Sequence, residues 1–129
     1  MRSLITLMFL LLGLLLSFSA RADWIMYGDN GKAEFFYDKK TIVVNGKFVS
    51  VMEMLNYSFP LRGVLSNRTT KEYDCGQSKF RNLVGEFFSG KNLSGDKVSE
   101  SSGEEEGWRN VIGGTQNEEL MHIVCGKPT

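Results

Sequence analysis

The chain has 129 residues, of which 42% are apolar and 23% charged, and its 15 basic and 15 acidic residues give a formal net charge of zero. This length suits one domain with a modest core and excludes a nucleotide-binding fold with a separate substrate domain. The balanced charge argues against a dedicated nucleic-acid binder and provides no general attraction to anionic membranes.

The N-terminal segment has the pattern of a cleaved secretory signal peptide. Arg2 gives a positive start, Leu4 to Phe18 is a nearly continuous apolar run, and Ala20-Arg21-Ala22 has the A-x-A form of a cleavage site. An uncleaved membrane anchor is the alternative, but the run is short for a full span. We therefore predict a signal peptide over 1–22 and a mature domain over 23–129 that has no transmembrane segment and is periplasmic, secreted or at the cell surface.

Cys75 and Cys125 are the two cysteines of the chain. An even number in an exported protein favours one disulfide between them. Such a bridge closes a loop of about 50 residues and contributes on the order of 4 kcal/mol in the chain-entropy model. A zinc site is the alternative, and the lack of nearby His or Cys partners argues against it. Asp23 follows the expected cleavage point, so we expect no lipid attachment at a mature N-terminal cysteine.

Short apolar and β-branched runs predict that most of the mature chain forms strands. Asn45-Gly46 between two such runs predicts a type I′ hairpin. Pro60 is expected to end the strand that follows, with a loop over 60–67. Segment 79–88 also fits a helical spacing, but Gly85 and the turn signals on both sides favour a strand. The expected strands are 24–27, 34–37, 41–44, 47–57, 68–75 and 79–88, with a short edge strand at Val98.

The C-terminal part contains the one convincing helix. The acidic segment 99–107 is expected to be a solvated loop, and Trp108 to Ile112 to return to the core. Thr115 and Glu118 form a capping box, in which each side chain bonds the other residue's backbone N–H. Leu120, Ile123 and Val124 share a face that we expect to be buried, and Gly126 follows the last helical residue, Cys125.

These elements predict an α+β fold. A small antiparallel sheet of about five to six strands would carry a C-terminal helix, and the disulfide between Cys75 and Cys125 would tie the helix to the sheet. A helix of about ten residues is marginal alone, so the bridge has a clear physical purpose.

No catalytic or metal-binding constellation is visible in the sequence, and we expect neither a cofactor nor a metal ion. His122 is the one histidine, and a hydrolase that uses it would need partners that the sequence does not offer. A positively charged group before and around Cys75 is a candidate contact for an acidic partner, and Arg62, Arg68 and Lys71 are its proposed binding residues. The alternative interpretation is that these are solvated charges on a strand surface.

The order of several motifs is similar to that of a known family. Phe36-Tyr37-Asp38, Glu72-Tyr73-Asp74-Cys75, Trp108-Arg109-Asn110-Val111-Ile112 and the terminal Cys125 occur in this order. In this the chain resembles the surface-adhesin protein E family of Gram-negative bacteria over nearly all of its mature part. The resemblance implies an antiparallel sheet with a disulfide-tied helix, and a protein of the outer membrane that binds host matrix and plasma proteins.

We therefore predict an exported, non-enzymatic binding module whose partner is a host matrix or envelope protein, and no nucleic acid. A periplasmic inhibitor or accessory subunit of an enzyme such as lysozyme is the alternative, in which the acidic segment 99–107 enters a basic cleft.

Overall fold

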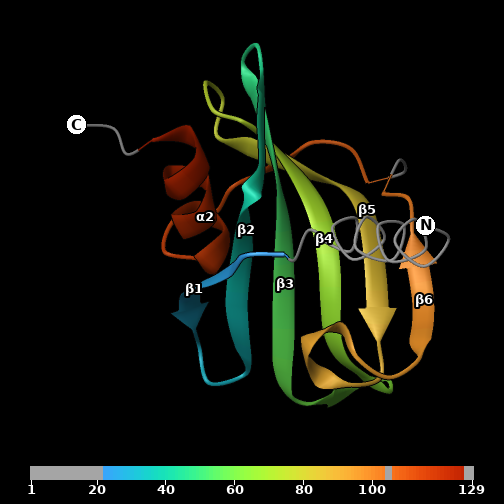
Figure 1. Ribbon diagram of the computed structural model, residues 1–129. Coiled ribbons are helices and arrows are strands. Elements are labelled where there is room, and N and C mark those ends of the chain that lie inside the picture. The colour runs from blue at the N-terminus through green and yellow to red at the C-terminus, as the bar shows by residue number, and fades with distance from the viewer. Residues whose placement is uncertain (1–21, 104–105, 127–129) are drawn as a thin grey trace, which may run out of the picture.

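The computed structural model describes residues 22–103 and 106–126, so the predicted signal peptide lies almost wholly outside the described residues (Figure 1). Seven strands, one short 3-10 helix and one α-helix make up the described fold. In chain order they are β1 (Trp24–Asp29), β2 (Ala33–Asn45), β3 (Phe48–Leu61), β4 (Val64–Asp74), β5 (Lys79–Phe88), η1 (Lys91–Leu93), β6 (Lys97–Ser101), β7 (Arg109–Asn110) and α2 (Gln116–Cys125).

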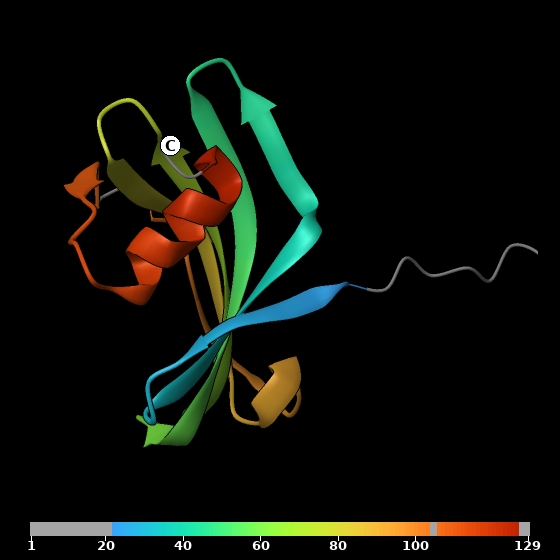
Figure 2. The same ribbon diagram turned by 90° about the vertical axis from the view of Figure 1, so that its left-hand side faces the viewer.

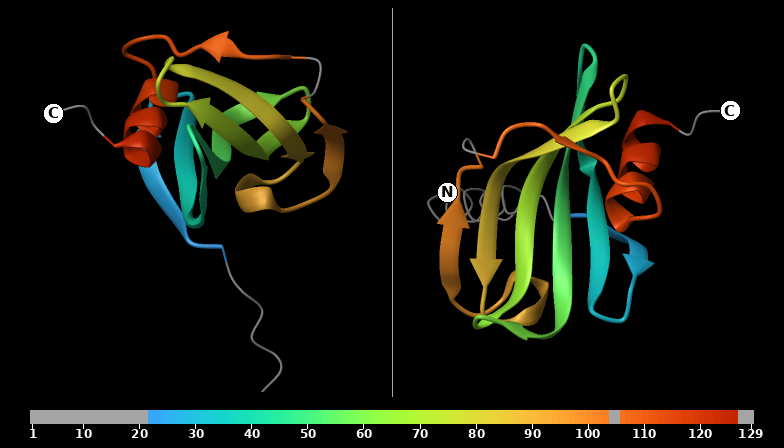
Figure 3. Two further views of the ribbon diagram at one scale, coloured as in Figure 1. Left: turned by 90° about the horizontal axis from the view of Figure 1, so that it is seen from above. Right: turned by 180° about the vertical axis from the view of Figure 1, so that it is seen from behind.

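The strands form one antiparallel sheet in which each of the first six strands pairs with its neighbour in sequence. Strand β7 pairs with β5 beyond the end of β6, because β6 occupies residues 85–88 of β5 and β7 occupies residues 79–80. The sheet is twisted and curled, as expected for long antiparallel strands (Figures 1 and 3). The predicted α+β architecture is confirmed.

Helix α2 covers one face of the sheet, which we call the helix face (Figure 2). Val51 of β3 and Tyr73 of β4 lie on this face, and both are fully buried against Leu120 and Met121 of α2. The predicted disulfide is present, with an S–S distance of 2.02 Å between Cys75 and Cys125. The buried side chains of α2 and the Cys75–Cys125 disulfide therefore both hold the helix against the same small core.

The start of α2 agrees with the sequence in part. The Thr115 hydroxyl accepts a hydrogen bond from the Glu118 backbone N–H at 3.3 Å, as the capping pattern predicts. The Glu118 carboxylate instead accepts from the Gly114 backbone N–H, at 3.2 Å. The helix is also turned slightly from the predicted orientation, since Met121 is buried with Leu120 while Ile123 is only half-buried.

The predicted β2–β3 hairpin is confirmed, but its turn is displaced by one residue. Asn45 is still paired, with Phe48, so Gly46 and Lys47 are the two turn residues. Gly46 has φ +62°, whereas Lys47 is not among the residues with positive φ. Glycine at the first turn position is the signature of a type II′ turn, and the expected type I′ is therefore wrong.

The loop predicted over 60–67 is largely strand. Strand β3 continues through Pro60 to Leu61, and β4 begins at Val64, so the loop expected over 60–67 is a two-residue turn. Pro60 is tolerated because the regular pairing of β3 with β4 lapses between Asn56 and Leu61, where no ladder hydrogen bond is required of it.

The C-terminal connection also differs from the prediction. Residues 99–101, expected in an acidic loop, belong to β6, which contains Val98 as predicted. Glu104 and Glu105 lie outside the described residues. Ile112 does not return to the core and is 70% exposed, whereas Trp108 is half-buried and stacks on Phe48 at 5.2 Å between ring centroids.

Candidate functional site

Helix α2 is too short to cover the whole helix face. Its ten residues span about 15 Å, whereas the 14 residues of β3 span about 46 Å. Along β3, Val51 is buried against α2 and Glu53 is also buried, whereas Leu55 and Tyr57 on the same face are only half-buried. The part of the face near the β3–β4 turn, at the lower end of Figure 1, is therefore left without a helical cover.

Two adjoining pockets occupy this uncovered end. The first has a volume of about 390 Å³ and lies between β2, β3 and the β1–β2 turn, with Phe35 and Leu55 in its wall. The second has a volume of about 260 Å³ and lies toward β5 and β6, with Phe87 and Val98 in its wall. Both pockets are lined by Tyr57 and Leu61, so we treat them as one site, the hairpin-end groove.

The rim of the hairpin-end groove exposes large apolar side chains. Phe59 is 79% exposed and Leu61 is 58% exposed, although both are large hydrophobic residues. They precede a two-residue turn in which Arg62 and Gly63 have φ +50° and +80°. Positive φ at both positions gives a tight type I′ turn, across which Leu61 pairs with Val64.

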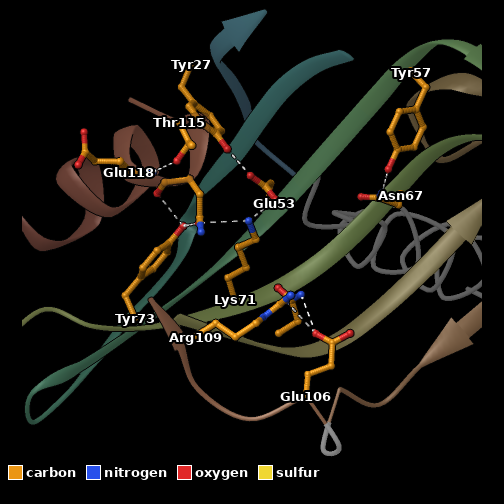
Figure 4. A network of polar contacts seen from close by, with 12 residues as sticks. Tyr27, Glu53, Tyr57, Asn67, Lys71, Tyr73, Glu106, Arg109, Thr115 and Glu118 are labelled. Carbon is orange, nitrogen blue, oxygen red and sulfur yellow. Dashed lines mark hydrogen bonds and ion pairs between the residues drawn. The ribbon is translucent and has the colours of Figure 1, made fainter. Parts of the chain in front are cut away.

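The polar groups of the groove are neutral or positive. Lys32 lines the first pocket and Arg62 the second, and among the described residues no carboxylate lines either one. The hydroxyl of Tyr57 accepts a hydrogen bond from the Asn67 side-chain amide at 2.6 Å (Figure 4). Burial, and to a smaller extent the charge of Glu53, raises the pKa of Tyr57 above its usual value.

A buried polar network links β1, β3 and β4 to α2 (Figure 4). Glu53 is 3% exposed, pairs with the Lys71 ammonium at 3.0 Å and accepts a hydrogen bond from the Tyr27 hydroxyl. Lys71 also donates to the Asn117 side chain of α2 at 3.3 Å, and the Tyr73 hydroxyl donates to the same oxygen at 2.5 Å. The network thus bonds the helix to the sheet through polar groups that are satisfied.

The predicted binding residues do not form one surface. Arg62 lines the hairpin-end groove. Arg68 pairs with Glu86 at 2.6 Å, while Lys71 is buried beside Glu53. Side chains of a strand alternate between its two faces, so residues 68 and 71 of β4 point to opposite sides of the sheet. The structure therefore places only Arg62 at the candidate site.

The other residues considered from the sequence lie away from the groove. His122 is half-buried on α2. In the parts of the chain that the structure describes, no group of three or more His, Cys, Asp or Glu residues has the arrangement of a metal site. Of the acidic segment, Glu106 pairs with Arg109 at 3.1 Å and also accepts from Asn82.

Phe59 and Leu61 are the site residues that sequence reasoning missed. The prediction ended the strand at Pro60 and so placed both residues at or beyond its end. The signal that would have found them is the alternation of Leu55, Tyr57, Phe59 and Leu61, which continues the apolar face of β3 across the proline.

The architecture and its disulfide agree with one family of proteins. The family model of the surface-adhesin protein E matches residues 24–126, nearly the whole of the described chain. The chain belongs to the surface-adhesin protein E family. The resemblance noted in the sequence is thereby confirmed, and an adhesin-like binding module is the function that this family supports. No curated protein matches the chain.

Solved structures of Haemophilus influenzae protein E share the fold of this chain. Crystal form II is 17% identical with a TM-score of 0.57, and the match covers 83% of this chain and 90% of that chain. The selenomethionine form is 16% identical with a TM-score of 0.58, covering 84% and 90%. Protein E from non-typeable Haemophilus influenzae is 17% identical with a TM-score of 0.54, covering 84% and 78%. Over the described residues, this chain has no helix that is both long and apolar enough to cross a membrane.

Proposed function

We propose that this protein is an exported, non-enzymatic binding module that holds a host matrix or envelope protein in the hairpin-end groove. The observation that carries the proposal is the exposure of Phe59 and Leu61 on the rim of two adjoining apolar pockets. Family membership supports an adhesive role, and the predicted signal peptide over 1–22 supports action in the periplasm, at the cell surface or outside the cell.

The groove has the composition of a protein interface. Aromatic residues are enriched at the buried centres of interfaces, and truncation of a few such side chains removes most of the binding energy. Phe35, Tyr57, Phe59 and Phe87 supply four aromatic rings to one region of the surface. Clustered exposure of this kind on a protein surface marks an interaction site more often than scattered single residues do.

The test compares two variants that remove similar amounts of exposed apolar surface. Phe59→Ser/Leu61→Ser changes the groove, whereas Val43→Ser/Val44→Ser changes the opposite hairpin, where the valines are 57% and 69% exposed. Each purified mature protein is assayed by surface plasmon resonance against a panel of purified matrix, plasma and envelope proteins. We expect the groove variant to lose at least about tenfold in affinity for a panel member and the control to keep it.

If only Val43→Ser/Val44→Ser lost affinity for a panel member, binding would be assigned to the β2–β3 hairpin instead of the groove. Wild-type protein that binds no member of the panel would remove the support for adhesion. Cell fractionation with protease treatment of intact cells then decides between a surface and a periplasmic partner.

A further inference from the structure

We propose that the occupant of the hairpin-end groove is an extended, acidic segment of polypeptide that places apolar side chains in the two pockets and a carboxylate beside Arg62. This inference rests on the proposed function, because it names the chemistry of the partner at the same site. Three features of the groove lead to it: the division into two pockets, the sign of the charge and the position of the sheet edge.

The two pockets suit neighbouring side chains of one chain segment. Their volumes of about 390 and 260 Å³ lie at or below the lower end of the range for small-molecule sites. Both open to solvent beside the exposed Phe59 and Leu61 rather than enclosing a ligand. In an extended peptide, side chains two residues apart lie on the same face at a spacing of about 7 Å, which allows one segment to enter adjoining pockets.

The sheet edge beside the second pocket favours an extended partner. Val98 and Ser99 of β6 line this pocket, and β6 is the last strand on its side of the sheet. In the described part of the chain no strand pairs with the outer edge of β6, so its outward backbone groups remain available to an extended segment.

The charges favour an acidic segment. Each pocket has one cation in its lining, Lys32 in the first and Arg62 in the second, and the described lining contains no carboxylate. Arg62 also occupies a left-handed backbone conformation, with φ +50°, that is costly for most side chains and suits asparagine or glycine better. Arginine is therefore not the residue that this backbone conformation favours. What it adds at this position is a guanidinium group beside the second pocket.

A membrane surface is the competing occupant, because an apolar hairpin tip beside cations also fits anionic lipid. Concave pockets favour side chains over a flat bilayer, and two cations give only a weak attraction to lipid headgroups. The experiment below includes this occupant as an outcome.

The test starts from an unbiased probe. A phage library of random peptides of about nine residues is selected on the immobilised mature protein, and enriched peptides are synthesised and measured by fluorescence anisotropy. We expect enrichment of sequences with two large apolar residues and at least one Asp or Glu. Arg62→Asn should weaken these peptides about tenfold, as expected for the loss of one charge-assisted hydrogen bond, and Arg62→Lys should weaken them less.

Two controls separate binding from folding. Asparagine tolerates positive φ better than arginine, so Arg62→Asn should unfold at the same or a higher temperature than wild type. Lys40→Asn removes an exposed cation of β2 outside the groove lining and should leave peptide affinity unchanged.

Enriched peptides that are neutral or basic, or an affinity that Arg62→Asn leaves unchanged, would overturn the inference about charge. The proposed function would survive either of these two results if Phe59→Ser/Leu61→Ser still removed binding to the protein panel. Peptide enrichment that is independent of Phe59 and Leu61 would overturn the inference about the occupant of the groove, whereas the protein panel decides the proposed function separately. Failure to enrich any peptide, together with Phe59-dependent sedimentation on vesicles of phosphatidylcholine and phosphatidylglycerol, would assign the groove to a membrane instead.

Discussion

Glu53 is a carboxylate that is buried in the sheet and held by an ammonium and a phenol. Lys71 stands 3.0 Å away, and its own side chain is 13% exposed, so the pair is largely removed from water. A buried pair of this kind is a weak source of net stability, but it leaves an uncompensated charge when one partner is removed. The residue that was predicted to bind an acidic partner thus neutralises an acidic group of its own chain.

Lys71→Met should therefore be strongly destabilising. We expect the free energy of unfolding to fall by about 3 kcal/mol or more, measured by urea denaturation, because Glu53 remains buried without its cation. Glu53→Gln/Lys71→Met removes both charges and should recover part of the loss. A change below about 1 kcal/mol in the single variant would contradict the prediction that Glu53 stays buried as an uncompensated charge.

The buried phenols predict a loss of stability at alkaline pH. Burial raises the pKa of Tyr27 and of Tyr73 far above the usual value, and the charge of Glu53 raises each further. In the unfolded chain both would ionise near pH 10. Because the folded pKa values are raised, the contribution to stability is complete below about pH 10 and is lost as the pH rises above it.

Tyrosinate absorbance and far-UV circular dichroism, followed together from about pH 9 upward, test this prediction. The absorbance due to Tyr27 and Tyr73 should appear only with the loss of secondary structure. Ionisation of all four tyrosines of the chain with the fold intact would contradict the described burial.

At the scale of the elements, α2 depends on its attachments. A helix of ten residues is marginal in isolation. Its hydrophobic anchors are Leu120 and Met121, its polar anchor is Asn117, and its covalent anchor is Cys125. The bridge joins the last residue of the helix to the residue after β4, so it restrains the end of α2 that the polar network does not reach.

Removal of the disulfide should destabilise the whole domain. Cys75 and Cys125 are separated by 50 residues, for which the chain-entropy model gives about 4 kcal/mol. We expect Cys75→Ser/Cys125→Ser to lower the urea midpoint accordingly and to speed amide hydrogen exchange in α2 more than in β3. Titration of unfolded, unreduced wild type should find no free thiol, and two reactive thiols would contradict the bridge.

The elements that could be predicted from the sequence are those specified by local signals. Glycine at the β2–β3 turn, the Thr115 cap and the turn signals on both sides of β5 each act within a few residues of the structure that they specify. The strand across Pro60 could not be predicted in the same way, because a proline ends a strand unless the partner strand leaves a gap opposite it. That gap between Asn56 and Leu61 is a property of the β3–β4 pairing and not of either segment alone.

At the scale of the whole molecule, the hairpin-end groove depends on how β3, β4 and β5 pair and on the shortness of α2, which leaves this end of the sheet uncovered. Tyr57 and Phe87 share a face because Leu55, two residues before Tyr57 on β3, pairs with Asn67 of β4, and Asn67 pairs with Phe87 of β5. The sequence places Arg62, Arg68 and Lys71 close together along the chain, whereas the sheet separates them by face and by distance along β4. Strand periodicity alone, applied to residues 68 and 71, would have predicted the division between faces.

Export remains a prediction that belongs to the whole chain. Expression in a Gram-negative host should give a protein whose N-terminal residue is Asp23, determined by N-terminal sequencing of the purified product. Replacement of Ala20 and Ala22 by Lys should block processing and leave the larger precursor with the membrane fraction. A product that keeps Met1 in the soluble fraction would contradict the predicted signal peptide.

The neighbour-to-neighbour order of the strands has a consequence for how the protein folds. All of the pairing from β1 to β6 is complete within residues 24–101, so the sheet requires no contact with the C-terminal end of the chain. Such a meander has short loops to close and should assemble quickly. Helix α2 follows the sheet in the chain, and without it the face that carries Val51 and Tyr73 would be open to water. A chain whose sheet forms before α2 docks would therefore expose an apolar surface that a chaperone can recognise.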